Sequence, residues 1–315
     1  MAGLGANGGF TSGPSSGASL QPADPNNSNI LPRIHDALQI IYSPQSTNQS
    51  RQEAQSFLED VKALNEGPSH GFTLSSDKSQ SPIVRHYGLS LLEHAIKHRW
   101  AEYSEQEAEY LRSWVLQLSQ GVSKDDPLYI RNKIAILWVE VAKRSWGAEW
   151  KDMDSLLVQL WQVPGFGPHK ELVLSVLETL SDEIFNGDDA VVAIREAVLS
   201  KAAVEIFTPA AVLLEAFPNR QAGPDVRCGE EGWLNRATVL LGECLNSDIQ
   251  GNEDVRSCAV KALSLLYSLM PWAIPKAVIA SRCVQIMCDG LVAPHVAVQK
   301  VPDLDVATLC CLCIS

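Results

Sequence analysis

Two histidines, His94 and His98, have the one-turn spacing that can place two imidazoles on one metal ion. The zinc-protease pattern needs a glutamate directly after the first histidine, and the residue there is Ala95. Both histidines also lie in a stretch rich in basic residues, which is typical of a solvated helix face. We therefore expect no metal site at this pair.

Three glycines near the start, Gly3, Gly5 and Gly8, have the spacing of a dinucleotide-binding turn. That turn needs a strand before it and a helix after it, and the surrounding sequence predicts neither. The chain also has no phosphate-binding loop of the P-loop type and no G-x-S-x-G nucleophile pattern. Cys283 and Cys288 are not accompanied by a second cysteine pair at zinc-finger spacing. We expect a binding protein without a catalytic site, cofactor or metal.

The composition favours a protein partner over DNA. The chain has 315 residues and a formal net charge of −12, which favours basic partners and disfavours nonspecific nucleic-acid binding. No apolar run reaches the length of a membrane-spanning helix, so we expect no membrane insertion. The first residues lack the pattern of a secretory signal, and the expected location is the nucleus or the cytoplasm.

The elements that carry these residues are amphipathic helices. Residues 81–100, SPIVRHYGLSLLEHAIKHRW, open with an N-cap serine, Ser81, followed by a proline in the first helical turn. Ser104 and Glu107 then form a capping box at the start of a second amphipathic helix. We expect these two helices to pair as a hairpin, and a further pair to follow over 126–161. A loop is expected over 65–80, which is rich in Gly, Pro and Ser.

Such pairs recur along the chain and predict its fold class. Their starts fall near residues 30, 82, 127, 169 and 232, a spacing of roughly 40 to 60 residues. We expect an all-α protein, an α-α superhelix in which antiparallel helix pairs stack as a HEAT/ARM-like solenoid. Leu91, Leu137 and Trp138 should be buried between repeats, and Trp146 and Trp150 should pack at a hairpin corner.

Three segments resemble a known family. IVRHYGLSLLEHAIKHRW (83–100) is similar to a string found in the exportin-five branch of the importin-β (karyopherin-β) superfamily. RQEAQSFLEDVK (51–62) resembles the second helix of the importin-β N-terminal domain. IRNKIAILWVEVAKRSWGAEWKDM (130–153) resembles the third repeat, although Gly147 and Lys151 replace two prolines there. The resemblance covers residues 30–165, is of fungal type, and implies the N-terminal part of a nuclear transport receptor.

The expected organisation follows from composition and from this resemblance. Residues 1–29 are expected to be a disordered leader rich in Gly, Ser, Asn and Pro. Residues 30–120 should form the importin-β N-terminal-like repeats, and residues 121–293 further exportin HEAT-like repeats. Residues 294–315 are an atypical tail, consistent with truncation, because ATLCCLCI lacks the polar outer face of a solenoid cap.

The resemblance also implies partners and a contact surface. Family members bind the GTPase Ran in its GTP form through inner helices of the first repeats, and carry structured RNA, tRNA or phosphorylated proteins between nucleus and cytoplasm, passing nucleoporins. Ran presents basic surface to this family, so polar residues on the second helices of the first three predicted pairs are the candidate contacts. These candidates are Gln55, Glu59, Glu105, Glu109, Arg112 and Asp154.

Two other functions remain open. One is a HEAT-repeat scaffold that assembles proteins without Ran, and the other is a helical solenoid that binds RNA itself. Binding to Ran loaded with GTP or GDP separates the first from a transport receptor, and salt-dependent RNA binding would favour the second.

Overall fold

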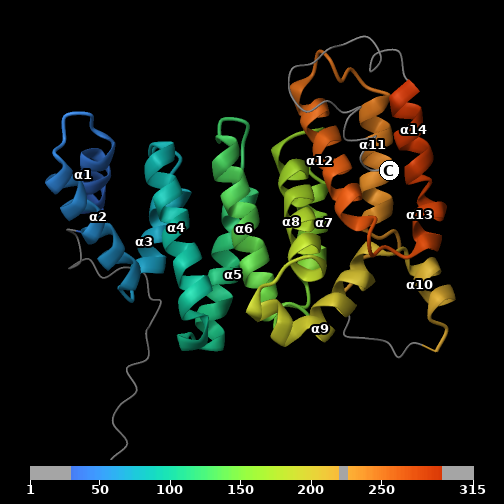
Figure 1. Ribbon diagram of the computed structural model, residues 1–315, viewed down its shortest axis with the longest axis horizontal. Coiled ribbons are helices and arrows are strands. Elements are labelled where there is room, and N and C mark those ends of the chain that lie inside the picture. Colours follow the sequence, from blue (N-terminus) through green and yellow to red (C-terminus); the bar gives the residue numbers. More distant parts are fainter. Residues whose placement is uncertain (1–29, 220–225, 293–315) are drawn as a thin grey trace, which may run out of the picture.

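The computed structural model describes residues 30–219 and 226–292, and both ranges consist of helices with short connections (Figure 1). In these ranges no strand occurs, apart from an isolated bridge between Trp146 and Trp150. The all-α prediction is therefore confirmed, while the predicted leader 1–29 and tail 294–315 lie outside the described residues. The helices are α1 (Ile30–Tyr42), α2 (Asn48–Ala63), α3 (Gly67–Ser76), α4 (Pro82–Arg99), α5 (Glu105–Gln120), α6 (Leu128–Ser145), α7 (Met153–Trp161), α8 (Pro168–Phe185), α9 (Ala190–Phe207), α10 (Ala210–Ala216), α11 (Trp233–Leu245), α12 (Glu253–Leu269), α13 (Pro275–Ser281) and α14 (Cys283–Val292).

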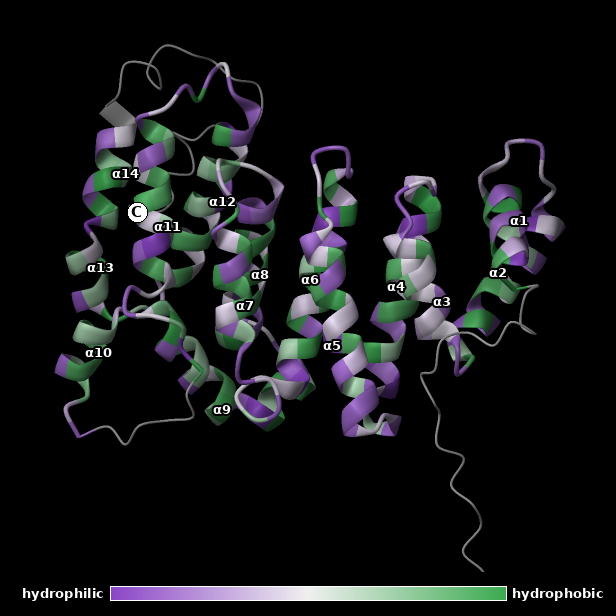
Figure 2. Ribbon diagram, turned by 180° about the vertical axis from the view of Figure 1, so that it is seen from behind, coloured by the Kyte–Doolittle hydropathy of each residue, from purple (hydrophilic) through white to green (hydrophobic). Residues whose placement is uncertain are grey.

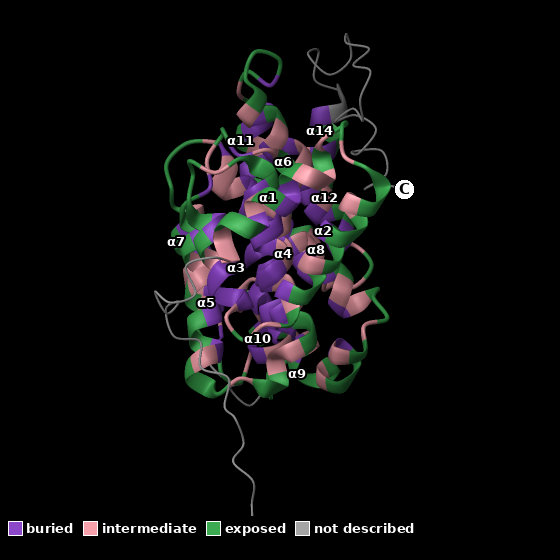
Figure 3. Ribbon diagram, turned by 90° about the vertical axis from the view of Figure 1, so that its left-hand side faces the viewer, coloured by how far each residue is buried: buried purple, intermediate pink, exposed green. Residues whose placement is uncertain are grey.

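Most of these helices form two rows along the molecule. Viewed end-on, α3, α5 and α7 lie to one side and α2, α8 and α12 to the other (Figure 3). The helices α4, α6, α8 and α12 pack closely, each against the next, whereas α3, α5 and α7 contact one another much less. Because helices crowd together on the concave side of a curved stack, we call α2, α4, α6, α8 and α12 the inner row and α1, α3, α5, α7 and α11 the outer row. This stack is the predicted solenoid.

Helix α3 stands where a loop was predicted over residues 65–80, so that prediction is wrong. Its sequence GPSHGFTLSS contains Gly, Pro and Ser and has no clear apolar stripe, which is why helix signals are weak. Packing against α4 stabilises this helix, although its own sequence carries only weak helix signals. A Cβ added to Gly71 would lie 2.7 Å from the Gly88 carbonyl oxygen, and one added to Gly88 would lie 2.6 Å from the Gly71 carbonyl oxygen. The two backbones approach this closely because both positions are glycine.

The extra helix changes how the following helices pair. Helix α4 packs mainly against α3, α5 packs against α6, and α7 against α8. The predicted hairpins over 81–120 and 126–161, which paired α4 with α5 and α6 with α7, are therefore wrong. Helices α5 and α7 are first helices of their pairs and belong to the outer row. The first predicted pair, α1 with α2, and the last, α11 with α12, are confirmed.

Helix starts follow local capping chemistry. The Ser81 hydroxyl caps α4, and Ser104 with Glu107 forms both hydrogen bonds of the capping box at α5, as predicted. Helix α2 begins at Asn48, because Thr47 is its N-cap and the Thr47 hydroxyl accepts the Ser50 backbone N–H at 3.1 Å. The connections before α2 and α6 are mostly hydrophilic (Figure 2).

Two apolar clusters lie between the rows. The smaller one joins α1, α2 and α3 to one side of α4 and contains Leu91. The larger one begins on the other side of α4, runs through α6, α8, α11 and α12 to α14, and contains Leu137 and Trp138. These three residues, and the pair Trp146 and Trp150, are all buried, as predicted. None of the described helices is long and apolar enough to cross a membrane.

Candidate partner-binding surface

Gln55 and Glu59 lie on the exposed side of α2, where they line a groove between α1, α2 and α4. The groove has a volume of about 310 Å³. Two apolar side chains at its edge, Tyr42 and Ile83, are exposed. The remaining lining residues are Leu38, Ile41, Leu58, Lys62, His86, Tyr87 and Ser90. A concave surface with exposed apolar groups and a polar rim is typical of a contact site for another protein.

The rim of this groove carries more than one kind of polar group. Glu59 forms an ion pair with Lys62 at 2.7 Å, and because the carboxylate is mostly exposed this pair contributes little to stability. On the opposite wall, the His86 ring lies edge-on to Tyr129 with 5.5 Å between ring centroids. Burial, and then the nearby Lys133 ammonium, lower the pKa of His86, so its imidazole is neutral at pH 7. A partner would meet a carboxylate and a neutral imidazole here.

The candidates on α5 lie on the outer row. Glu105 and Glu109 are exposed. The Arg112 side chain is only 12% exposed, and its guanidinium lies 3.7 Å from the carboxylate of Glu149. The structure therefore brings Glu105 and Glu109 together on one face, but this face belongs to a different row from that of Gln55.

Asp154, the candidate on α7, is not at the surface. Asp154 is 2% exposed. Its carboxylate accepts hydrogen bonds from the Trp233 indole N–H at 2.5 Å and from the Cys228 backbone N–H at 2.6 Å. Burial raises the pKa of this carboxyl, against the effect of these two donors. Asp154 holds α11 and the segment before it against α7, and it cannot touch a partner without local opening.

Sequence reasoning missed a set of ion pairs between neighbouring inner-row helices. In each of three such pairs the residues are 40 positions apart in the sequence. The three pairs are Glu93–Lys133, Arg131–Glu171 and Lys143–Glu183. Because the repeat advances by about this length, opposite charges one period apart face each other across adjacent helices. A search of the sequence for opposite charges at this separation could have found them.

Lys143 and Glu140 form the most buried part of this network. The Lys143 ammonium, 1% exposed, lies 2.7 Å from the Glu140 carboxylate and 2.7 Å from Asp189. Burial alone would lower the pKa of Lys143, but hydrogen bonds to Asp189 and Glu140 outweigh it and raise the pKa. Glu140 also accepts from Arg144 at 2.7 Å and lies 3.5 Å from Lys97. Since Asp189 is the N-cap of α9, the network ties that helix to the inner row.

His94 and His98 lie beside each other on α4, with 4.9 Å between ring centroids. In the described part of the chain, no group of three or more His, Cys, Asp and Glu side chains is placed to hold a metal ion. The surface described above offers charge and apolar contact, which can steer and hold a partner.

Comparison with known proteins adds independent findings. Residues 127–205 match the family model described as Exportin 1-like protein. Protein MSN5 of Saccharomyces cerevisiae is 33% identical over 261 residues, which is 78% of this chain and 21% of that relative. Exportin-5 of Homo sapiens is 33% identical and exportin-5 of Dictyostelium discoideum 30% identical, each over 49% of this chain and 13% of the relative. The chain thus spans about a fifth or less of the length of these relatives.

The stacked helix pairs, the match of residues 127–205 to the exportin family model and the 33% identity to Protein MSN5 over 78% of this chain together identify a karyopherin of the exportin kind. The relatives narrow the class further. The chain belongs to the exportin-5-like karyopherins, the family that residues 83–100 resemble.

Proposed function

We propose that this protein is a nuclear export receptor that binds cargo together with Ran in its GTP form and shuttles between nucleus and cytoplasm. The 33% identity to exportin-5 of Homo sapiens over 49% of the chain is the observation that supports this most directly. Several of the relatives are named exportins, which are transport receptors rather than enzymes. Because the chain spans only part of their length, the activity of the whole receptor is itself part of the proposal.

Within this chain, Gln55 and Glu59 are our preferred Ran contacts. Their position on an exposed inner-row groove supports this choice. Carboxylates there would steer a basic partner by electrostatic attraction. Glu105, Glu109 and Arg112 form an alternative surface on the outer row, and we retain it as the competing candidate. The burial of Asp154 argues for a role in stability instead.

The test measures binding of the chain to Ran loaded with GTP or with GDP, at low and at high salt. The first variant combines Gln55→Lys with Glu59→Lys, and its matched control combines Glu105→Lys with Glu109→Lys. We expect the inner-row variant to weaken binding to Ran-GTP by about tenfold and to reduce the salt dependence, as lost charge complementarity does. The control should bind within about twofold of the parent chain.

Each other result has a defined meaning. If only the control loses affinity, the contact lies on the outer row. If both variants bind as the parent does, neither set of carboxylates contacts Ran. Equal affinity for the GTP and GDP forms would contradict the Ran-dependent receptor and favour a scaffold without a GTPase.

The cargo proposal is that a structured RNA, a tRNA or a phosphorylated protein binds together with Ran, with nucleoporins as further partners. The formal net charge of −12 disfavours RNA binding by this chain alone. RNA retained by the chain without Ran at physiological salt would instead support the RNA-binding solenoid.

A further inference from the structure

The connection between α8 and α9 contains an asparagine followed by a glycine, Asn186–Gly187. No other Asn–Gly pair occurs in the part of the chain that the structure describes. Such a pair is chemically labile, because the backbone nitrogen of the glycine can attack the side-chain amide of the asparagine. Glycine has no Cβ to hinder that approach. Both residues are exposed, so water reaches the site.

The structure leaves both reacting groups of this pair free. Asn186 is the C-cap of α8, and its own backbone N–H donates to the Asp182 carbonyl oxygen at 2.9 Å. The side-chain amide of Asn186 and the backbone N–H of Gly187 form no hydrogen bond with any described residue. Rotation about the Cα–C bond of Asn186 moves the Gly187 nitrogen, and this rotation breaks no hydrogen bond of that nitrogen. The attack therefore does not require α8 to unfold.

Packing explains why a glycine follows Asn186. A Cβ added to Gly187 would lie 2.6 Å from the Glu183 carbonyl oxygen. Real side chains do not approach a carbonyl oxygen this closely, so any other residue would force the connection to shift. The tight turn after α8 thus requires the same residue that makes Asn186 labile.

The connection between α11 and α12 contains a protected counterpart. Asn246 is likewise a C-cap, but its side-chain amide donates to the Gly242 carbonyl oxygen at 2.8 Å. The next backbone N–H, that of Ser247, donates to the Cys244 carbonyl oxygen at 3.1 Å. Both groups that would react are engaged here, so an attack requires local opening first.

We propose that Asn186 is a site of spontaneous deamidation. The Gly187 backbone nitrogen attacks the side-chain carbonyl carbon of Asn186. The side-chain nitrogen leaves as ammonia with the proton of the Gly187 amide, and a succinimide ring forms. Water then opens the ring at either of its carbonyl groups, which leaves aspartate or isoaspartate. The reaction consumes water, releases ammonia and needs no enzyme. It does not depend on Ran, so this proposal and the proposed function can fail separately.

The charge that deamidation adds lies at an unfavourable position. Residue 186 directly follows α8, and a negative charge at a helix C-terminus opposes the helix dipole. Two acidic residues precede it and two follow it, namely Asp182, Glu183, Asp188 and Asp189. Repulsion among these carboxylates acts on the short link to Asp189, which caps α9 and pairs with Lys143. Deamidation should therefore loosen the start of α9 from the inner row.

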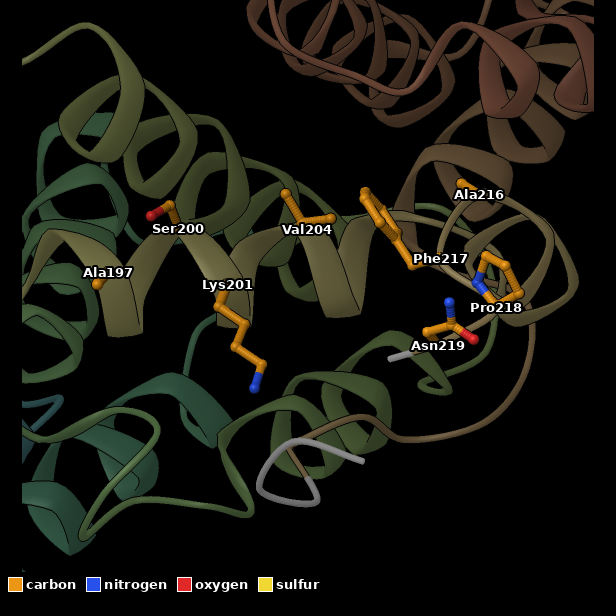
Figure 4. A pocket seen from close by; sticks show the side chains of 8 residues that line it. All are labelled: Ala197, Ser200, Lys201, Val204, Ala216, Phe217, Pro218 and Asn219. Atoms are coloured by element: carbon orange, nitrogen blue, oxygen red, sulfur yellow. The ribbon is translucent and has the colours of Figure 1, made fainter. Parts of the chain in front are cut away.

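The two halves of α9 should respond differently. Polar contacts hold the first half to α6, since Arg195 donates to the Lys143 and Trp146 carbonyl oxygens, both at 2.6 Å. The second half borders an apolar hollow of about 700 Å³, which Val204 and Phe217 face (Figure 4). The added charge acts on the polar end, so hydrogen exchange should speed up there and not beside the hollow.

The first test follows deamidation of the chain at physiological temperature and mildly alkaline pH. Peptide mapping by mass spectrometry measures the change from amide to acid at Asn186 and at Asn246, in the folded chain and in concentrated urea. We expect Asn186 to react in the folded chain within about threefold of its rate in urea, whereas folding should slow Asn246 by at least about tenfold. The proposed site is overturned if Asn186 does not react, or if folding protects it as strongly as it protects Asn246.

The second test measures the effect of the added charge on α9. Asn186→Asp carries the charge of the product, and its matched control, Asn186→Gln, keeps a neutral amide. We expect Asn186→Asp to speed hydrogen exchange by about threefold in the last turn of α8 and the first turn of α9, and Asn186→Gln to leave it unchanged. Equal exchange rates in the two variants would overturn the effect on α9, whatever the rate of deamidation.

Discussion

The first helix pair and the central part of the inner row are built from similar amphipathic helices, yet they are held together differently. Helices α1 and α2 share a small core that ends at α4, and they make few contacts with later helices. The helices α4, α6, α8 and α12 pack directly on one another around one larger core. Ion pairs one repeat apart also join α4 to α6 and α6 to α8.

This difference shows where the solenoid is cohesive. Extensive contact between successive inner-row helices, with charges that match the repeat period, couples the central helices into one unit. The first pair lacks both features, so we expect it to open at a lower free energy than the central helices do. The preferred Ran contacts, Gln55 and Glu59, lie on this less strongly coupled pair.

The largest expected effect is that of Trp138→Ala in the central core. Trp138 is fully buried, its ring stacks on Trp150 at 4.9 Å, and its indole N–H donates to the Ser119 hydroxyl. Removing a buried Trp typically costs about 3–5 kcal/mol. Urea unfolding, monitored by circular dichroism, should show this loss in the free energy of unfolding of the whole central unit. An unchanged midpoint would mean that the core does not depend on this residue.

The second largest loss of stability is expected for Lys143→Met, because this variant removes a buried cation from three carboxylates. Breaking a buried ion pair on one side typically costs about 3–5 kcal/mol, and the remaining cations beside Glu140 should place this variant near the lower end. The matched control is Lys97→Met on the same network, where the side chain is 38% exposed, and it should cost less than about 1 kcal/mol. Equal losses in the two variants would contradict the central role of Lys143.

Ile34→Ala in the first pair should cost about 2 kcal/mol, and only locally. Ile34 is buried in the small core formed by α1, α2, α3 and one side of α4. Hydrogen exchange should therefore speed up in α1 and α2, while amides of α6 and α8 keep the rates of the parent chain. Faster exchange throughout the inner row would show that the first pair is coupled to the rest as strongly as the central helices are.

The sequence was sufficient to predict the fold class and the central core, because α4, α6 and α8 are long and rich in apolar residues, and α4 also begins with the capping residue Ser81. It was insufficient for α3, whose helix depends on the close approach of Gly71 and Gly88 from two segments. That one missing helix shifted the pairing of those that follow. It is also why residues on α5 and α7 were expected on the second helices of their pairs.

The candidate site was predictable only in part for a related reason. Periodicity showed that Gln55 and Glu59 face away from the core of their own helix, and they do. For Asp154 the same reasoning could not see that Trp233 and the Cys228 backbone, more than 70 residues later, cover the carboxylate. Burial by a distant segment is a tertiary effect, and a local pattern carries no information about it.

The smallest expected effect concerns His70, which lies on α3 between the first pair and the central helices. His70 is 1% exposed, and neither ring nitrogen has a hydrogen-bond partner among the described residues. Burial lowers the pKa of His70 below its ordinary value of 6.5, while the Glu66 carboxylate acts weakly in the opposite direction. The unfolded chain therefore takes up this proton at a higher pH than the folded chain does. The stability of the fold with a neutral His70 is therefore fully present above pH 6.5. Stability is lost as the pH falls from 6.5 towards the folded-state pKa of His70.

We expect His70→Phe to reduce this loss of stability, because the variant has no side chain at this position whose protonation opposes folding. Thermal unfolding of the variant and the parent at a pH above and a pH below 6.5 measures the difference. Burial also lowers the pKa values of His86 and His94, so part of the slope should remain in every variant. If the melting temperatures of His70→Phe and the parent change equally with pH, His70 gains its proton in the folded chain without loss of stability. Helix α3 would then join the first pair to α4 less tightly than the burial of His70 indicates.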